Sequence, residues 1–357
     1  MKAGALVSAD GNVLWTRQPA QRRAIASITK IMTALVVLDR LPLDDTATVP
    51  PEAVTLGESD AQLKKGETLS VSDLFEALLV KSGNDAAITL ARRVSGTEDG
   101  FVTLMNEKAA ELGLTNTHFA NSHGLDENGN YSSAEDLAVL ARYAMTREAF
   151  RKVVGLAAAR IGNGKSARIV ESSNQLIGSY PGANGVKTGW TSDAGYSVVA
   201  SAARNGVELT AVVLGTGSER ARFSEARKLL DWGFEHYRPQ RISTKDTRVG
   251  AVGVTDFIDT TVPAIASRDE TAVVIDVDGP ISRKVRLMPG VRAPVRRGQR
   301  VGSIAITQGG RLLATVPVVA AREVDAPGIF ERLTIGIRRV WLRLTGEPTV
   351  AASAALS

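Results

Sequence analysis

The chain begins with two short apolar runs of β type, Ala3 to Val7 and Asn12 to Trp15, on either side of Asp10-Gly11. An Asp-Gly pair readily adopts the positive φ angles of a tight hairpin turn, so two antiparallel strands are expected. From Ser27 the period changes, and apolar residues recur at helical spacing: Ile28, Ile31, Met32, Leu35, Val36 and Leu38. This pattern predicts a helix that begins at or next to Ser27 and is buried over most of its circumference.

Helical periodicity dominates the region from about Ser70 to Arg160, which predicts a helical subdomain. Its amphipathic stretches are Val71 to Val80, Ala86 to Val94, Phe101 to Leu112 and Ala134 to Met145. Strand patterns then return at Lys187 to Thr191, Tyr196 to Ala202 and Val207 to Leu214, and Asn205-Gly206 predicts a hairpin turn between the last two. A helix is expected over Glu219 to Tyr237. We therefore expect an α+β domain over residues 1–240, in which helices cover an antiparallel sheet.

The pattern of apolar and polar residues changes beyond Pro239. Short alternating segments such as Ala272 to Val277 and Val301 to Thr307 are bounded by the turn residues Asp278-Gly279-Pro280 and Gly309-Gly310. This spacing predicts a second, small all-β domain over residues 241–326.

A basic amphipathic helix is predicted over residues 327–345, followed by a disordered tail over 346–357. The apolar positions of the helix are Phe330, Leu333, Ile337, Val340, Trp341 and Leu344, and its arginines are Arg332, Arg338, Arg339 and Arg343. The charges exclude a spanning helix, but an interfacial helix can bury its apolar face and gain about 1 kcal/mol for each arginine near anionic lipid. Docking on the β domain is the alternative. We favour the membrane because the apolar face is continuous, includes Trp341 and lies at the chain end.

Composition narrows the class of protein only a little. At 357 residues the chain exceeds the length at which one hydrophobic core keeps growing, which favours two domains. The net charge of +5 is spread along the chain, so nucleic acid, anionic lipid and cell-wall polymer all stay open as partners. The lack of cysteine excludes disulfides, thiolate metal sites and cysteine nucleophiles. No signal-peptide pattern is present, so the leader of an exported protein would be absent from this chain.

The first candidate for chemistry is Ser27-Ile28-Thr29-Lys30, an S-x-x-K pattern at the start of the buried helix. Residues three apart share a helix face, so Lys30 can reach the Ser27 hydroxyl. A serine needs a base to attack at neutral pH, and a lysine serves if burial and a neighbouring positive charge keep it neutral. The alternative is a helix cap at Ser27 followed by a solvated lysine.

The second candidate is Ser82-Gly83-Asn84, in the loop between two predicted helices. A hydroxyl and an amide placed there can relay a proton and bind a substrate amide. The loose S-x-N pattern also fits Ser172-Ser173-Asn174, and a Ser or Asn before a helix is usually a cap.

The third candidate is Lys187-Thr188-Gly189, placed at the start of a predicted strand. A lysine, a hydroxyl and a residue without a side chain let an extended substrate lie beside the strand while its carboxylate meets the cation. The alternative is an edge lysine that protects a sheet from unwanted pairing.

The order S-x-x-K, S-x-N, K-T-G in one chain is specific, because it is the signature shared by class A β-lactamases and penicillin-binding proteins. The sequence resembles the D-alanyl-D-alanine carboxypeptidase family of low-molecular-mass penicillin-binding proteins. The resemblance covers essentially the whole chain and is strongest up to Tyr237. Besides the motifs, it rests on residues 78–86, Asn121 to Asp126, Tyr131 to Leu137 and Leu229 to Phe234.

The resemblance implies a role for each residue of the motifs. Ser27 would be the nucleophile and Lys30 its base, while Ser82 and Asn84 would relay the proton and contact the substrate amide. The substrate-binding residues would be Lys187, Thr188, Gly189 and Arg222, of which Lys187 and Thr188 hold the terminal carboxylate and Arg222 lies near them. The backbone N–H groups of Ser27 and Trp190 would form the oxyanion hole. Trp190 is bulkier than the residue often found there, and Asn184 stands where an Asp is common, which affects substrate preference more than reaction type.

The resemblance also implies the fold and the partners. We expect a β-lactamase/transpeptidase-like α+β domain, then the all-β domain and the amphipathic helix. The substrate would be a peptidoglycan stem peptide ending in D-Ala-D-Ala, with β-lactam antibiotics as inhibitors, an anionic membrane surface as a further partner and no nucleic acid. This substrate places the protein at the extracytoplasmic face of the membrane, in the periplasm or cell-wall space. No metal and no organic cofactor is expected, since His118, His123 and His236 lack ligand spacing.

Two other functions stay open from the sequence. A β-lactamase-like hydrolase would share the acylation residues, although no clear Glu-x-x-x-Asn deacylation pattern is present. A non-catalytic peptidoglycan-binding protein could retain the fold without activity.

Overall fold

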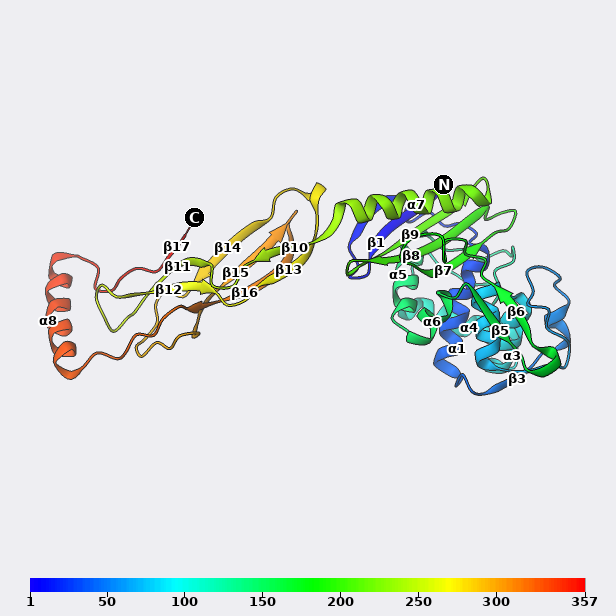
Figure 1. The fold of residues 1–357 in the computed structure, drawn as a ribbon, viewed down its shortest axis with the longest axis horizontal. Helices are drawn as coiled ribbons and strands as arrows, with labels where there is room; N and C mark the ends of the chain where they lie inside the picture. The colour runs from blue at the N-terminus through cyan, green and yellow to red at the C-terminus, as the bar shows by residue number, and fades with distance from the viewer. Residues whose placement is uncertain (357) are drawn as a thin grey trace. The chain divides into compact units, whose positions relative to one another are not determined.

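The computed structural model describes residues 1–356 and divides into two compact units, Met1–Glu235 and the segment from His236 onward (Figure 1). Each unit is described by itself. The first has an α+β fold and the second is all-β with a helix near its end, as the sequence predicts.

The first unit is built on a five-stranded antiparallel sheet in the order β2-β1-β9-β8-β7. The strands are β1 (Ala3–Ser8), β2 (Val13–Arg17), β7 (Ala183–Gly189), β8 (Tyr196–Arg204) and β9 (Val207–Thr216). Both predicted hairpins are present, and Gly11, Asn205 and Gly206 have the positive φ angles that their turns require. Because β1 lies between β2 and β9, the start of the unit pairs with a strand from its end.

The position of the K-T-G motif on its strand differs from the prediction. The strand begins at Ala183, which pairs with Ala202 of β8, so Lys187 to Gly189 form its last residues instead of its first. The preceding Gly182, Asn184 and Gly185 have the composition of a loop and concealed the strand from pattern analysis. The motif therefore lies at the end of an edge strand, next to the turn that leads into β8.

Helices cover both faces of this sheet (Figure 1). On one face α7 (Glu219–His236) packs so closely that a Cβ atom on its Gly233 would lie 2.6 Å from a methyl carbon of Leu209 in β9. On the other face α5 contacts β1 and β9, and α6 contacts β7. The helices of this side are α1 (Lys30–Arg40), α2 (Val71–Glu76), α3 (Asn84–Ser95), α4 (Glu98–Glu111), α5 (Ala134–Met145) and α6 (Glu148–Val154).

Short elements join these helices. A single π-helical turn over Ala77–Lys81 continues α2, and a 3-10 turn over Ala26–Thr29 precedes α1. Two small hairpins pair β3 (Thr46–Thr48) with β4 (Thr68–Ser70) and β5 (Ala158–Ile161) with β6 (Arg168–Glu171). The buried α1 lies at the centre, where it contacts α3, α4 and α5.

The second unit has a six-stranded sheet in the order β14-β15-β16-β12-β11-β17 and a separate pair of strands, β10 and β13. Its strands are β10 (Tyr237–Ser243), β11 (Arg248–Gly253), β12 (Thr261–Ala266), β13 (Glu270–Ile275), β14 (Ser282–Leu287), β15 (Arg300–Gln308), β16 (Arg311–Ala320) and β17 (Ala354–Ala355). Alternate positions of these strands, such as Val316, Val318 and Ala320, form one apolar core.

The helix α8 (Ile329–Thr345) presents its apolar side chains to solvent. Phe330 is 85% exposed and Leu344 is 82% exposed, whereas Leu342 is buried against the unit. Among the residues that the structure describes, no helix is long and apolar enough to cross a membrane. After α8 the chain returns to the sheet, where Ala354–Ala355 pairs with β11 in a segment for which the sequence predicts no element. Ser357, the last residue of that segment, lies outside the described residues.

Candidate active site

Ser27 and Lys30 meet at the junction of two helical segments. Ser27 is in the 3-10 turn that runs directly into α1, so Lys30 follows one turn later on the same side. The Nζ atom of Lys30 lies 2.9 Å from Ser27 Oγ, and it donates to Asn84 Oδ1 at 2.7 Å and to the carbonyl oxygen of His123 at 2.6 Å. A neutral amine has two N–H bonds and one lone pair. With both N–H groups engaged, the lone pair remains for the Ser27 hydroxyl proton.

The surroundings of Lys30 favour its neutral form. The side chain is fully buried, which rules out a solvated first-turn lysine. Burial is the main reason that the pKa of Lys30 falls well below its usual value, and the charge of Lys187 lowers it further. The carboxylate of Asp85 opposes both effects. A base that is neutral near physiological pH is what proton removal from a serine requires.

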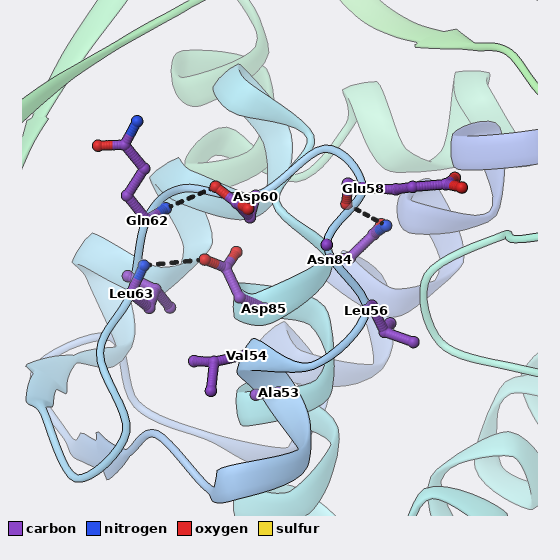
Figure 2. Close-up of a pocket in the computed structure, with 10 residues that line it drawn as sticks. Ala53, Val54, Leu56, Glu58, Asp60, Gln62, Leu63, Asn84 and Asp85 are labelled. Atoms are coloured by element: carbon purple, nitrogen blue, oxygen red, sulfur yellow. Dashed lines mark hydrogen bonds between the residues drawn. The ribbon is translucent and has the colours of Figure 1, made fainter.

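The Ser82-Gly83-Asn84 segment connects the π-helical turn to α3. Ser82 has a left-handed backbone conformation with φ +68°, which ends the helical turn, and both Ser82 and Asn84 are buried. The amide of Asn84 donates to the carbonyl oxygen of Glu58 at 2.7 Å (Figure 2). Its oxygen accepts a hydrogen bond from Lys30. Within the described residues the hydroxyl of Ser82 makes no hydrogen bond with Ser27 or Lys30, so it is free to contact a substrate.

The second S-x-N pattern, Ser172-Ser173-Asn174, has a structural role. Ser173 shares a 2.8 Å hydrogen bond with Thr188, and Asn174 donates to the carbonyl oxygen of Gly185 at 2.9 Å. These contacts hold the segment against β7, so it supports the strand instead of facing Lys30.

Lys187 and Arg222 form a buried pair of like charges. Lys187 is 1% exposed, and burial together with the charge of Arg222 lowers its pKa to about 7. The guanidinium of Arg222 reaches from α7 to the carbonyl oxygen of Gly189 at 3.3 Å and pairs with Glu219 at 2.7 Å. Among the described residues Lys187 has no carboxylate partner. An anion placed beside Lys187 would relieve this repulsion, which suits the site to a carboxylate.

Two glycines let other segments approach the backbone of Ser27. A Cβ atom at Gly189 would lie 2.7 Å from the carbonyl oxygen of Ile25 and 3.2 Å from the nitrogen of Ser27. At Gly124, where φ is +91°, it would lie 2.1 Å from the carbonyl oxygen of Ala26. The residue after Gly189 is Trp190, which is 54% exposed and whose ring centroid lies 5.7 Å from that of Tyr196. The end of β7 thus lies directly against the turn that contains Ser27, and Trp190 is the next residue of the chain.

Two groups at the site were not identified from the sequence. His123 lacks the spacing of a metal ligand, but its carbonyl oxygen accepts a hydrogen bond from Lys30, and its ring is buried with a pKa lowered to about 4 by burial and by Lys30. Asp85 follows Asn84 directly and is 1% exposed. The signal for Asp85 in the sequence is a carboxylate that directly follows the motif and precedes the apolar residues Ala86, Ala87 and Ile88.

Comparisons with known proteins agree with this geometry. Residues 2–218 match the family model described as D-alanyl-D-alanine carboxypeptidase, and residues 237–326 match that of the penicillin-binding protein 5 C-terminal domain. The chain is 32% identical over 352 residues to D-alanyl-D-alanine carboxypeptidase DacF of Bacillus subtilis, covering 94% of this chain and 89% of that protein.

A second relative is D-alanyl-D-alanine carboxypeptidase DacC of Escherichia coli, 33% identical over 91% of this chain and 84% of that protein. Among solved structures, penicillin binding protein 6B from Escherichia coli matches with a TM-score of 0.69 and 32% identity, covering 89% of this chain and 94% of that one. The similarity extends over both units.

Proposed function

The chain belongs to the D-alanyl-D-alanine carboxypeptidase family, and we propose that it removes the terminal D-alanine of peptidoglycan stem peptides through an acyl-enzyme on Ser27. The family, the α+β fold followed by an all-β domain, and the serine-type carboxypeptidase activity are as the sequence predicts. The observation that carries the proposed mechanism is the position of Lys30 Nζ, 2.9 Å from Ser27 Oγ and buried beside a second cation.

The reaction begins with proton transfer from the Ser27 hydroxyl to Lys30. Ser27 Oγ attacks the carbonyl carbon of the penultimate D-Ala, and the oxygen of that carbonyl gains negative charge. The N–H of Ser27 is suited to stabilise this charge, because the first N–H groups of a helical turn have no intrahelical partner. The N–H of Trp190, directly after β7, would be the second donor. The C–N bond then breaks, and the leaving D-alanine amine takes the proton with Ser82 as relay.

The acyl-enzyme ester is hydrolysed by water in the second half of the reaction. Lys30 accepts a proton from the attacking water, and Ser27 Oγ regains a proton as the ester C–O bond breaks. Asn84 contacts the substrate backbone amide. A β-lactam ring presents a comparable carbonyl and carboxylate to the same groups, so penicillin would acylate Ser27 in the same way.

Binding of the terminal carboxylate is assigned to Lys187, Thr188 and Arg222. Replacing Lys187 with methionine should lower kcat/KM for a peptide ending in D-Ala-D-Ala by about 100- to 1000-fold, because the substrate carboxylate loses a desolvated charge partner. Wild-type protein should also prefer this peptide to its C-terminal amide, and the variant should lose that preference. The readout is the rate of D-alanine release.

The exposed Lys228 of α7, whose side chain is 69% exposed beside Glu225, supplies a control. Lys228→Met should keep both the rate and the preference for the free carboxylate. An unchanged preference in the Lys187 variant would contradict the assignment of the carboxylate site.

Association of α8 with an anionic membrane surface is the second part of the proposal. Arg339 donates to the carbonyl oxygens of Thr255 and Phe257, and Arg338 pairs with Asp259 at 3.2 Å. These contacts join the polar side of α8 to the β unit, so the apolar side chains face outward. From His236 onward the chain has 18 Lys and Arg against 11 Asp and Glu, a net charge of +7, which favours anionic lipid. This arrangement supports a location at a membrane surface, and the proposed peptidoglycan substrate places it at the extracytoplasmic face.

Vesicle binding tests this part. The full chain should sediment with phosphatidylglycerol vesicles, and the double variant Phe330→Asp, Ile337→Asp should lose at least about 100-fold in affinity because two apolar side chains no longer enter the interface. Val277→Asp is a matched control, since Val277 is 60% exposed in the same unit but away from α8. Equal binding of the double variant and the wild type would contradict a membrane role for this face.

A further inference from the structure

A loop over residues 55–63 lies beside Asn84 and Asp85 and contacts the Ser82-Gly83-Asn84 segment (Figure 2). Three hydrogen bonds join them: Asn84 donates from its backbone to the carbonyl oxygen of Ser59 at 2.8 Å and from its amide to that of Glu58 at 2.7 Å, while the Ser59 hydroxyl donates to the carbonyl oxygen of Ser82 at 3.1 Å. The loop has an unusual backbone, because Ser59 and Gln62 both have positive φ angles. Such residues persist only where their surroundings hold them in place.

The carboxylate of Asp85 is the group that holds this loop. It accepts hydrogen bonds from the backbone N–H of Ala61 at 2.9 Å and of Leu63 at 3.0 Å, as well as from that of Ala86 at 2.8 Å. The carbonyl oxygen of Ala61 is bound from the other side by Arg168 at 2.9 Å. Asp85 is buried, which raises its pKa, while the three N–H donors favour the charged form.

Gly83 is explained by the same carboxylate. A Cβ atom at position 83 would lie 2.6 Å from Asp85 Oδ1 and 3.2 Å from the Cβ of Ala61. Its φ angle is −61°, so no backbone requirement selects glycine here. The middle residue of the motif is therefore kept small by the carboxylate that lies against it.

The orientation of the Asn84 amide depends on this loop. With its NH2 group directed at the carbonyl oxygen of Glu58, its oxygen faces the N–H of Lys30. If the amide were rotated by 180°, its NH2 group would face the N–H of Lys30 and its oxygen would face the carbonyl oxygen of Glu58, so neither hydrogen bond could form. The loop position thus decides which atom of Asn84 meets the base.

We propose that Asp85 is a positioning residue for acylation: its carboxylate fixes the loop that orients the Asn84 amide toward Lys30, and its charge balances the buried cations around that base. The inference rests on the proposed acylation of Ser27 and extends it to a residue that does not touch substrate.

The charges around Lys30 determine the sign of the expected pH effect. Lys187 of β7 lowers the pKa of Lys30, Asp85 of α3 raises it, and His123, from the segment after α4, contributes a ring that burial keeps neutral. Removing the Asp85 charge therefore lowers the pKa of Lys30 further. Because acylation requires neutral Lys30, its rate falls as pH falls through that pKa, and the fall should move to lower pH in the variant.

The test measures acylation by benzylpenicillin across pH in wild type, Asp85→Asn and Asp136→Asn. Asp136 is also buried and also holds a loop, by accepting hydrogen bonds from Asn116 and Thr117. Its replacement by asparagine should therefore reduce stability by a similar amount without changing the site. Asp85→Asn should acylate about 10- to 100-fold more slowly, with its acid-side fall displaced to lower pH, whereas Asp136→Asn should keep the wild-type rate and profile.

A second variant keeps the proposal testable if Asp85→Asn does not fold. Gly83→Ala displaces the carboxylate but keeps its charge, so acylation should slow while the acid-side fall stays in place. Wild-type rates in either variant, or a slower Asp85→Asn with an unmoved profile, would overturn the proposal. If wild-type protein itself forms no adduct on Ser27, the acyl-enzyme mechanism fails instead, which separates the two outcomes.

Discussion

Replacing Ser27 by alanine is expected to abolish release of D-alanine from a peptide ending in D-Ala-D-Ala. Within the described residues, Ser27 Oγ is the only hydrogen-bond partner of Lys30 Nζ that carries a proton to give up, since the two others are the acceptors Asn84 Oδ1 and the His123 carbonyl oxygen. Without Oγ the covalent intermediate cannot form, and any remaining rate would come from water alone. The measurement is D-alanine release at saturating peptide.

The fold should survive this change, because one hydroxyl is removed and the partners of Lys30 in α3 and after α4 stay in place. Thermal unfolding of the variant should match that of wild type within a few degrees, and the peptide should still bind at the carboxylate site. D-alanine release at more than a trace of the wild-type rate would exclude Ser27 as the nucleophile.

Replacing Lys30 by methionine should slow acylation by about 100- to 10000-fold, the range typical for loss of a positioned general base. Methionine is similar in volume and suits a fully buried position, but it cannot accept the Ser27 proton. A second effect follows from the pKa shift of Lys30. The wild-type acylation rate should decrease as pH falls through the lowered pKa of Lys30, and the methionine variant should lack this decrease.

Lys108→Met separates loss of the base from general loss of a lysine. Lys108 lies on α4 and pairs with Asp39 at 2.8 Å. It is not among the residues that form hydrogen bonds with Lys30 at the site. This control should keep both the acylation rate and its pH dependence. If the Lys30 variant retained the acid-side decrease, another group would have to be the base.

Local patterns predicted much of the fold. The period of 3.6 identified α1, α3, α4 and α5, and turn chemistry at Asp10-Gly11 and Asn205-Gly206 located two hairpins. The beginning of β7 was missed, because Gly182, Asn184 and Gly185 look like a loop and only pairing with β8 makes them a strand. The strand conformation of this segment therefore depends on its hydrogen bonds with β8 and not on its local sequence propensity.

The candidate site was predicted from the order of the motifs, but the motifs do not reveal the contacts that position their side chains in the fold. The spacing of Ser27 and Lys30 implied their contact, whereas the binding of Lys30 to the His123 carbonyl oxygen joins residues 93 apart in sequence. The support that Asp85 gives to residues 61–63 is likewise visible only in the folded chain. A buried backbone acceptor and a loop-holding carboxylate leave no periodic pattern in a single sequence.

The most direct test of the acyl-enzyme mechanism is the intact mass of the protein after incubation with benzylpenicillin, with peptide mapping and a time course of any adduct. A persistent adduct of one penicillin on Ser27 is the predicted result, because the carboxylate site and the Ser27–Lys30 pair should accept the drug while hydrolysis stays slow. No adduct would contradict the mechanism and favour a non-catalytic peptidoglycan-binding protein. Rapid turnover of penicillin would leave the acylation of Ser27 intact, but it would contradict slow hydrolysis of the adduct and favour a β-lactamase-like hydrolase.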